Sequence, residues 1–420
     1  MIFLSIQTTV VLTSVAVFLL VIILLVAILL YAKKKLTPAG TVQIDINEGY
    51  KTLEVEPGST LLTTLGNSKI LLPSACGGGG TCGMCRCQVV DGGGSILPTE
   101  TGFFTRKEQN ENWRLACQVK VKEDLKLHIH PEILGVKKWE CEVISNRNVA
   151  TFIKEFVVKL PEGETLDFKS GGYIQIDVPK IEVDFKEMEV QPEFREEWEK
   201  FGIFDLKMKN PEPTFRAYSM ANHPAEGNIV MLNIRIATPP WDRANNHFKN
   251  VNPGVCSSFI FSRKPGDKVM VSGPYGEFFL KNNDNEMMFI GGGAGMAPMR
   301  SHLFHLFHTV KEQKKKVTFW YGARSWREVF YYDQFRDIEK NFPNFTFNLA
   351  LSEPKPEDNW TGPTGFIHQV IYDNYLSKHE EPEEIDYYLC GPPMMNDAVQ
   401  KMLYDLGVPT ENILFDDFGG

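Results

Sequence analysis

The chain is 420 residues long, which at roughly 150 residues per domain is enough for about three domains. Hydrophobic residues make up 43% and charged residues 23%, and the 34 glycines and 25 prolines follow no repeat, so collagen-like, low-complexity and disordered proteins are excluded. With 53 acidic against 44 basic side chains the net charge is -9, and no Lys/Arg stripe stands out, so we expect no nucleic acid partner.

The N-terminus departs from this soluble average. Residues 1–32 carry no charge, and residues 10–31 are almost wholly aliphatic or aromatic. About 22 such residues form a helix of roughly 33 Å, long enough to cross a hydrocarbon layer of about 30 Å. A cleaved signal peptide is the alternative, but its positive n-region and small-residue cleavage site are not visible. Because Lys33, Lys34 and Lys35 follow directly, we expect residues 1–36 to be a single-pass anchor in the lipid bilayer, with the remaining chain in the cytoplasm.

Four cysteines between residues 76 and 117 carry the first chemical signal. Cys76, Cys82 and Cys85 share a glycine-rich run, and Cys117 follows at a distance. Cytoplasmic thiols stay reduced, so this clustering favours metal or redox chemistry over disulfides. Glycines let the backbone curl around an inorganic core and aim N–H groups at its sulfurs, which suits an iron–sulfur cluster. The plant-type ferredoxin spacing is C-x4-C-x2-C with a remote cysteine, and the first gap here is one residue longer.

Other interpretations of these cysteines stay open. A structural zinc site usually has two close cysteine pairs, whereas this run has one, and a chain without metal is the third possibility. Cys87, which begins a strand-like run, and Cys141 are expected to be apolar core residues.

The surrounding residues predict a small mixed sheet. Apolar and polar residues alternate over residues 42–46 and again over 53–55, and a short helix is expected after Thr60. Residues 37–131 therefore resemble the β-grasp ferredoxin fold. The resemblance places Cys76, Cys82, Cys85 and Cys117 in the ligand positions of a 2Fe-2S cluster.

Residues 134–282 consist mainly of strand-like runs separated by Gly and Pro, and this pattern predicts an antiparallel β-barrel. Arg216-Ala217-Tyr218-Ser219 lies within it, and the turn Gly254-Val255-Cys256-Ser257-Ser258 follows later. An arginine and the N–H groups of a helix N-terminus suit a pyrophosphate, and a tyrosine face can stack on a flat ring. Either run alone also fits a strand edge. Their order and separation resemble the ferredoxin–NADP reductase superfamily.

That resemblance implies FAD in the barrel. Arg216 would pair with phosphate and Tyr218 would stack on the isoalloxazine. Ser219 would hydrogen-bond near the reactive nitrogen of that ring, and Ala217 belongs to the same flavin-binding run. The diphosphate would be capped by two hydroxyls and three backbone groups: Ser257, Ser258, Gly254, Val255 and Cys256. Phe418 is the candidate aromatic for the other flavin face, although two glycines follow it where relatives have a nearly terminal aromatic.

Strand and helix patterns alternate over residues 283–420, which predicts a doubly wound parallel α/β domain. A glycine loop at 291–295 between a strand and a helix lets a dinucleotide phosphate approach the backbone and the helix dipole. In the same superfamily this half binds the nicotinamide cofactor, with Cys390 and Ser219 bordering the hydride path. The implied contacts are Gly292, Gly293, Gly295, Ala297, Pro298, Arg324, Cys390, Gly391 and Pro392.

The charge after the strand at residues 347–351 bears on cofactor choice. Glu353 would repel a 2′-phosphate and suits a ribose hydroxyl, so NADH is expected over NADPH. Arg324 and Arg327 are the groups that could still hold such a phosphate. Residues 181–212 form an insertion relative to the superfamily, which is either a solvated extension or a docking surface for a partner.

The whole chain resembles the F subunits of bacterial Na+-translocating NADH:quinone reductases. The shared features are the uncharged N-terminal span, the Cys76–Cys85 spacing, the insertion before Arg216 and the ending Asp416-Asp-Phe-Gly-Gly. The resemblance implies an anchor (1–36), a ferredoxin domain (37–131), an FAD barrel (134–282) and an NADH domain (283–420) at the bacterial inner membrane.

It also implies electron transfer from NADH to FAD and singly through the cluster to other membrane subunits, which reduce ubiquinone and move sodium. Neither quinone reduction nor ion transport follows from the residues themselves. A reductase that feeds an oxygenase and a non-catalytic scaffold with degenerate cofactor sites remain the alternatives.

Overall fold

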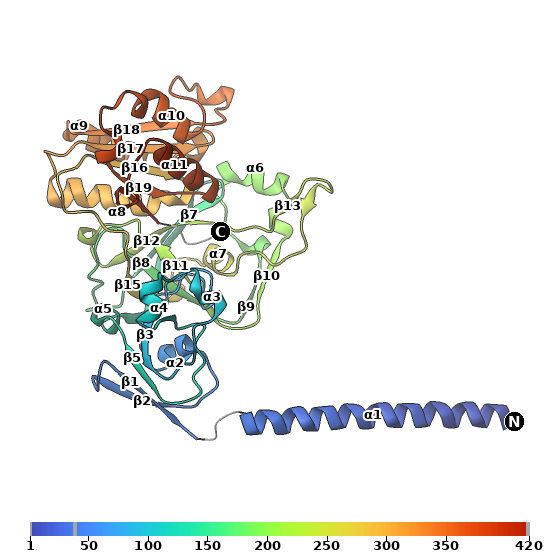
Figure 1. Cartoon of the computed structure of the whole chain (residues 1–420). Coiled ribbons are helices and arrows are strands. Elements are labelled where there is room, and N and C mark those ends of the chain that lie inside the picture. Colours follow the sequence, from blue (N-terminus) through green and yellow to red (C-terminus); the bar gives the residue numbers. More distant parts are fainter. Residues whose placement is uncertain (1, 37–39, 417–420) are drawn as a thin grey trace. The chain divides into compact units, whose positions relative to one another are not determined.

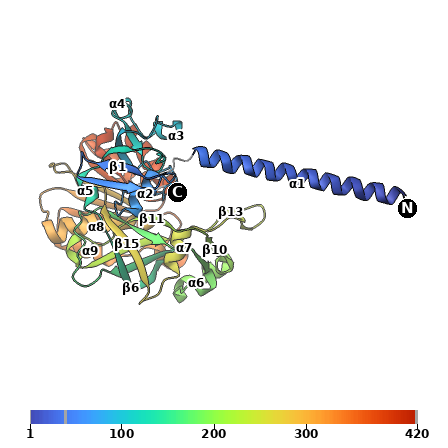
Figure 2. The same ribbon diagram turned by 90° about the horizontal axis from the view of Figure 1, so that it is seen from below.

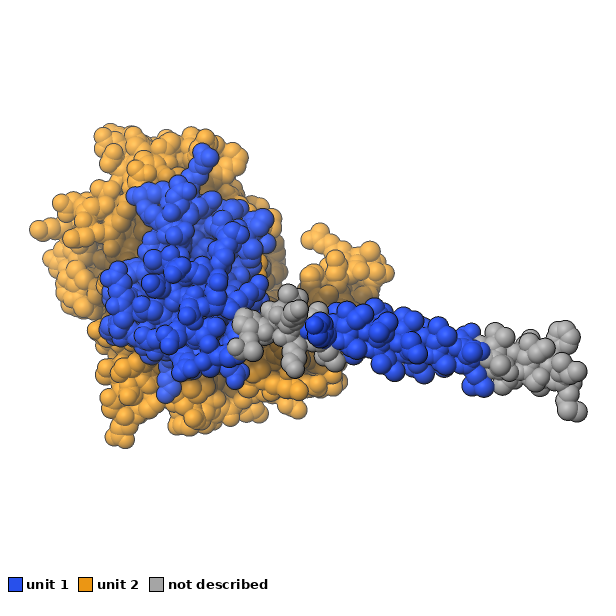
Figure 3. Space-filling model, turned by 60° about the horizontal axis from the view of Figure 1, so that its bottom comes forward, with its two compact units in different colours: residues 1–72, 83–134 blue, residues 73–82, 135–420 orange. Residues whose placement is uncertain are grey.

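A computed structural model describes residues 2–36 and 40–416 (Figure 1). The chain forms two compact units (Figure 3). The first contains residues 1–72 and 83–134, and the second contains residues 73–82 and 135–420. The loop at 73–82, which lies inside the expected ferredoxin segment, thus belongs by its contacts to the second unit.

Helix α1 (Ile2–Leu36) opens the first unit. Its segment Leu12–Leu29 has a mean hydropathy of 3.2, and none of its residues is buried in the protein. Within the described residues it is the one helix that is long and apolar enough to cross a membrane.

The rest of the first unit is built on a five-stranded mixed sheet in the order β2-β1-β5-β3-β4. The strands are β1 (Val42–Ile46), β2 (Lys51–Val55), β3 (Arg86–Asp91), β4 (Trp113–Leu115) and β5 (Leu125–His128). Strand β1 runs antiparallel to β2 and parallel to β5, and its alternating apolar residues Val42, Ile44 and Ile46 are buried, as their spacing predicts. The helices are α2 (Leu61–Asn67, capped by Thr60), α3 (Pro98–Thr101), α4 (Arg106–Asn110) and α5 (Pro131–Leu134).

The second unit contains a six-stranded antiparallel sheet in the order β11-β8-β15-β6-β7-β12. Figure 2 shows β6, β11 and β15 of this sheet. Its strands are β6 (Lys137–Ala150), β7 (Ile153–Lys159), β8 (Tyr173–Val178), β11 (Thr214–Ser219), β12 (Ile229–Arg235) and β15 (Lys268–Tyr275). A bridge between Met220 and Leu232 joins the two edges, so the sheet closes into the expected barrel. Helix α7 (Val255–Phe261) and the small hairpin of β13 (Trp241–Asp242) and β14 (His247–Phe248) complete it.

The insertion folds onto the barrel. It contains β9 (Ile181–Asp184), α6 (Pro192–Lys200) and β10 (Lys207–Asn210), and β9 pairs antiparallel with β10. Its apolar residues, among them Phe185, Trp198 and Met208, are buried in the same core as the barrel strands. The prediction of a purely solvated extension is therefore wrong, because apolar side chains of the insertion are part of the hydrophobic core.

The C-terminal part is a five-stranded parallel sheet in the order β18-β17-β16-β19-β20. The strands are β16 (Met287–Gly292), β17 (Val317–Ala323), β18 (Phe345–Leu351), β19 (Asp386–Cys390) and β20 (Ile413–Phe415). One apolar layer packs α8 (Met296–Phe304) and α9 (Tyr332–Asn341) against the sheet, and a second layer packs α10 (Ile367–Asn374) and α11 (Pro393–Asp405). Helices in both layers make this the doubly wound fold that the sequence predicts.

Candidate functional site

The parallel sheet reverses its strand order between β16 and β19. The chain adds β17 and β18 on one side of β16 and then returns to add β19 and β20 on the other. Loops leaving the carboxyl ends of such a pair diverge and leave a crevice. A cavity of about 430 Å³ lies there, lined among others by Gly292, Gly293, Arg324 and Pro392.

Glycine is required where the two loops approach each other. A Cβ on Gly295 would run into the carbonyl of Cys390, and one on Gly292 would lie 2.8 Å from the sulfur of Met395. Gly293 has a φ of 57°, in the left-handed region that favours glycine. The structure therefore brings the glycine loop, Cys390, Gly391 and Pro392 to one place, while Ala297 and Pro298 lie buried in α8 directly behind it.

Arg324, which lines this cavity, forms an ion pair. Arg324 Nε lies 3.5 Å from Glu353 Oε2, and both side chains are exposed. The backbone holds them together, because the Glu353 N–H donates to the Arg324 carbonyl at 2.7 Å. Arg324, which by sequence is a possible phosphate ligand, thus has its charge opposed by Glu353.

The Arg216–Ser219 run forms β11, and its side chains alternate between the two faces of the strand. Tyr218 contacts the thiol of Cys256 on α7, and burial together with that thiol raises the pKa of Tyr218 well above its usual value. The Ser219 hydroxyl donates to Asp416 Oδ2 at 2.5 Å, so the segment after β20 reaches β11. Phe418 lies outside the described residues.

The serine hydroxyls of the turn at residues 254–258 are not placed as the resemblance implies. The Ser258 side chain is fully buried and donates to the Gly254 carbonyl at 2.7 Å, and Ser257 makes the same contact at 3.2 Å. Both hydroxyls are thus engaged within the turn. The groups that remain to meet a diphosphate are the backbone N–H groups in the first turn of α7, around Val255 and Cys256, which lack helical partners.

The cysteine loop holds two thiols close together. Cys76 Sγ and Cys82 Sγ are 3.3 Å apart. A hydrogen bond from Cys82, opposed by burial and assisted by the backbone N–H groups of Thr81, Cys82 and Gly78, lowers the pKa of Cys76 to about 3. Gly77, Gly78 and Gly80 have positive φ and turn these N–H groups inward. A thiolate ringed by N–H groups is the ligand environment that an iron–sulfur cluster needs.

The other two expected ligands belong to the first unit. Cys85 and Cys117 are buried there, and the Ala116 N–H donates to the Cys85 carbonyl at 2.8 Å, which makes their backbones neighbours. Cys87 is also buried, and burial raises the pKa of its thiol to about 12, in keeping with an apolar core residue.

The loop carrying Cys76 and Cys82 rests on the barrel. A Cβ on Gly77 would meet the Arg216 guanidinium and lie 2.8 Å from the Phe215 carbonyl, and the Gln175 amide donates to the Ser74 carbonyl at 3.4 Å. Strand β11 therefore touches the cysteine loop with Arg216 and the end of the parallel sheet with Ser219.

Two contacts that support the expected site were not predicted from the sequence. Arg114 forms a buried ion pair with Glu100 at 2.8 Å, and Glu100 also accepts from the Leu115 N–H, which fixes the strand that leads to Cys117. Asp416 belongs to the ending that resembles the family, but no local pattern predicts its contact, since its partner Ser219 lies 197 positions away.

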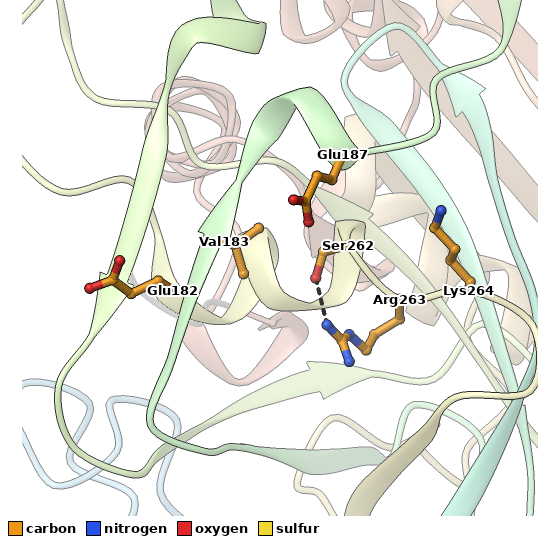
Figure 4. Close-up of a pocket in the computed structure, with 6 residues that line it drawn as sticks. All are labelled: Glu182, Val183, Glu187, Ser262, Arg263 and Lys264. Carbon is orange, nitrogen blue, oxygen red and sulfur yellow. Dashed lines mark hydrogen bonds between the residues drawn. The ribbon is translucent and has the colours of Figure 1, made fainter.

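A second cavity, of about 310 Å³, lies beside the insertion (Figure 4). It is lined by side chains of both charge signs and one hydroxyl: Glu182, Val183, Glu187, Ser262, Arg263 and Lys264. None of the expected site residues within the described part of the chain lines it.

Comparison with known proteins defines the class of this site. Residues 44–122 match the 2Fe-2S iron–sulfur cluster binding domain, and residues 289–401 match the oxidoreductase NAD-binding domain. The fold is similar to that of the ferredoxin reductase of carbazole 1,9a-dioxygenase (TM-score 0.58, 24% identity, 90% of this chain and 98% of that chain). It is also similar to the flavohem-like FAD/NAD binding domain of nitric oxide dioxygenase from Vibrio cholerae (TM-score 0.50, 21% identity, 67% and 99%). The protein is an iron–sulfur, nicotinamide-dependent oxidoreductase with a reductase fold.

Relatives that match nearly the whole chain identify its family. The F subunit of the Na(+)-translocating NADH-quinone reductase of Methylococcus capsulatus is 56% identical over 93% of this chain and 95% of its own. The Psychrobacter arcticus protein of the same name is 54% identical over 97% and 98%. The chain belongs to the family of Na(+)-translocating NADH-quinone reductase F subunits, as its motifs predict.

Proposed function

We propose that this chain is the NADH-oxidising entry component of a sodium-pumping NADH:quinone reductase. NADH occupies the 430 Å³ cavity, FAD lies on β11, and a 2Fe-2S cluster is held by Cys76, Cys82, Cys85 and Cys117. The observation that carries the proposal is the position of β11, which contacts the cysteine loop through Arg216 and the nicotinamide half through Ser219.

Each residue of the flavin site has a separate task. Arg216 and the N–H groups of α7 bind the diphosphate, Tyr218 packs on the ring, and Ala217 keeps the strand against β8. When bound, FAD supplies the conversion between a two-electron nicotinamide and a one-electron cluster. Asp416 holds the Ser219 hydroxyl in one orientation beside the ring.

The nicotinamide site favours NADH. Gly292, Gly293 and Gly295 allow the diphosphate to approach the backbone, and Cys390 and Pro392 border the nicotinamide end. Glu353 meets the adenosine ribose and opposes a 2′-phosphate, while it also neutralises Arg324.

Helix α1 and the family support the proposed membrane attachment and the proposed partner subunits. Leu12–Leu29 crosses the bilayer once, and the lysines at 33–35 keep residues 40–416 in the cytoplasm of a bacterial cell. Electrons leave to other membrane subunits, which reduce ubiquinone and move sodium, in keeping with the names of the relatives. Domains 1–36, 37–131, 134–282 and 283–420 divide these tasks.

Cys82→Ala tests the division of labour. The purified full-length variant should contain less iron and acid-labile sulfide, because one thiolate ligand is lost, but anaerobic NADH should still bleach its flavin absorbance as fast as in wild type. Cys141→Ala, which removes a buried barrel thiol, is the matched control and should keep a full cluster. Loss of both flavin reduction and cluster in Cys82→Ala, or zinc in place of iron in wild type, would contradict the proposal.

A further inference from the structure

The insertion between β8 and β11 contacts the turn that joins β6 to β7. Trp198 on α6 is fully buried, and its indole N–H donates to the Thr151 carbonyl at 2.7 Å. Its ring packs against Phe152 and Phe261. At the start of the same helix, the Gln191 amide oxygen accepts from the Asn148 N–H at 2.8 Å. The insertion thus contacts both the end of β6, at Asn148, and the turn that follows it, at Thr151.

This turn lies between the two cores of the unit. Phe152 packs against the barrel core, whereas Ala150 and Ile153 are buried in the core of the parallel sheet. Phe152 and Ile153 also line the 430 Å³ cavity, and Ile153 lies 3.8 Å from the Cβ position of Gly293 in the glycine loop. One wall of the cavity is therefore formed by barrel residues at the β6–β7 turn.

A second link runs from the turn into the cavity. The Thr151 N–H donates to Glu328 Oε2 at 3.1 Å, and the Thr151 hydroxyl donates to the other carboxylate oxygen. Glu328 lines the cavity. Independently, Glu197 on α6 lies 3.8 Å from Lys355, which follows β18. The insertion thus contacts the nicotinamide half both through the turn and directly.

We infer that the insertion at 181–212 positions the NADH cavity wall, and that Trp198 is a positioning residue for NADH binding. The Trp198 indole fixes Thr151, Thr151 orients Glu328, and Phe152 and Ile153 are held at the spacing that the dinucleotide needs. A wall fixed before binding does not have to be ordered by the ligand, so affinity rises while the reacting atoms are unaffected. The inference rests on the proposed function, because it assumes that this cavity takes NADH.

Trp198→Phe tests it in the flavin-loaded full-length protein. The substitution keeps most of the ring packing and removes the N–H donor, whose loss typically corresponds to about a 5- to 10-fold change in an equilibrium constant. Calorimetric titration with NAD+, which cannot reduce the protein, should give a Kd that is higher than in wild type by up to about 10-fold, because the free energy of the lost hydrogen bond limits the effect on binding. The limiting rate of flavin reduction at saturating NADH should stay within about 2-fold. Amide exchange of residues 148–153 without ligand should be faster.

Two further variants make the outcome decisive. Trp139→Phe is the matched control, since the Trp139 indole donates to Glu164 at 2.9 Å in the same barrel, away from the turn; its Kd should equal that of wild type. Thr151→Val removes only the hydroxyl link to Glu328 and should raise the Kd as well, so it decides the question if Trp198→Phe fails to fold.

Unchanged affinity in both test variants, an equal rise in Trp139→Phe, or a lower limiting rate with unchanged affinity would overturn the role of Trp198. Wild-type protein that does not bind NAD+ would instead overturn the proposed function, so the two failures are distinguishable.

Discussion

An exposed ion pair lies at the cavity where we propose that NADH binds. Glu353 supplies the carboxylate, and Arg324, held 3.5 Å away, is its cationic partner. Exposed pairs of this kind contribute little to stability, typically about 0–1 kcal/mol. Their effect on an incoming phosphate is larger, because the phosphate carries about two negative charges into the same place.

Glu353→Gln should shift selectivity toward NADPH. The variant removes one negative charge and leaves Arg324 available to a 2′-phosphate, so the kcat/KM ratio of NADPH to NADH should rise by about 10-fold, equivalent to roughly 1.4 kcal/mol. Steady-state rates of flavin-dependent ferricyanide reduction with each nucleotide measure the ratio. Glu357→Gln makes the same charge change on an exposed acid four residues later and should leave it unchanged. An unaltered ratio in Glu353→Gln would rule out the carboxylate as the selecting group.

At the scale of elements, α8 both carries the glycine loop and holds it against the barrel. Arg300 donates to the Ala221 carbonyl and forms an ion pair with Glu226 at 2.7 Å, and the Ser301 hydroxyl donates to the Asn222 carbonyl at 2.8 Å. The next residue of α8, His302, is fully buried, and its Nδ1 lies 3.3 Å from the Ser170 hydroxyl. The helix is therefore buried on the barrel side as well as on the sheet side.

The buried histidine makes stability depend on pH. Burial, with a contribution from neighbouring His305, lowers the pKa of His302 to about 3 from its ordinary 6.5. Between these two values the unfolded chain binds a proton that the folded chain does not, so stability is complete above about pH 6.5 and is lost as the pH falls toward 3. The free energy of unfolding should drop by about 2 kcal/mol between roughly pH 7 and pH 5 from this group alone.

His302→Gln should flatten that pH dependence, because the amide does not titrate, even if it is less stable at neutral pH. Denaturant unfolding followed by circular dichroism at about pH 7, 6 and 5 measures the slope. His247→Gln, on the exposed β13–β14 hairpin, is the control and should keep the wild-type slope. Equal slopes in all three proteins would show that His302 titrates normally in the folded state.

At the scale of the whole molecule, α1 distinguishes a component of a membrane complex from a reductase that feeds an oxygenase. The segment Leu12–Leu29 is predominantly apolar, carries no charged residue and is exposed along its length, which is unfavourable in water and favourable in lipid. The two cofactor-binding domain matches, residues 44–122 and 289–401, both lie after this helix. Attachment to the membrane and internal electron transfer are therefore expected to be separable.

Deletion of residues 2–32 tests this separation. The shortened chain should appear in the soluble fraction, bind its cofactors and reduce ferricyanide with NADH at the wild-type rate, but NADH-dependent quinone reduction by membranes should fall to background. Replacement of Leu12–Leu29 by an unrelated apolar helix of equal length should restore membrane attachment. Full quinone reduction without α1 would favour the soluble reductase interpretation.

Local patterns in the sequence determined the elements and their chemistry. Alternating residues such as Val42, Ile44 and Ile46 predict β1, the glycine loop predicts the β16–α8 turn, and the cysteine spacing predicts a cluster, because each signal lies within a few residues of its own function. Only the tertiary structure decided how these elements meet. It engaged the Ser257 and Ser258 hydroxyls inside their own turn, paired Arg324 with Glu353, joined Ser219 to Asp416 and bonded Trp198 of the insertion to Thr151, beside two residues that line the cavity. These contacts join residues that are distant in the chain or depend on side-chain direction, and a local pattern carries no information on either.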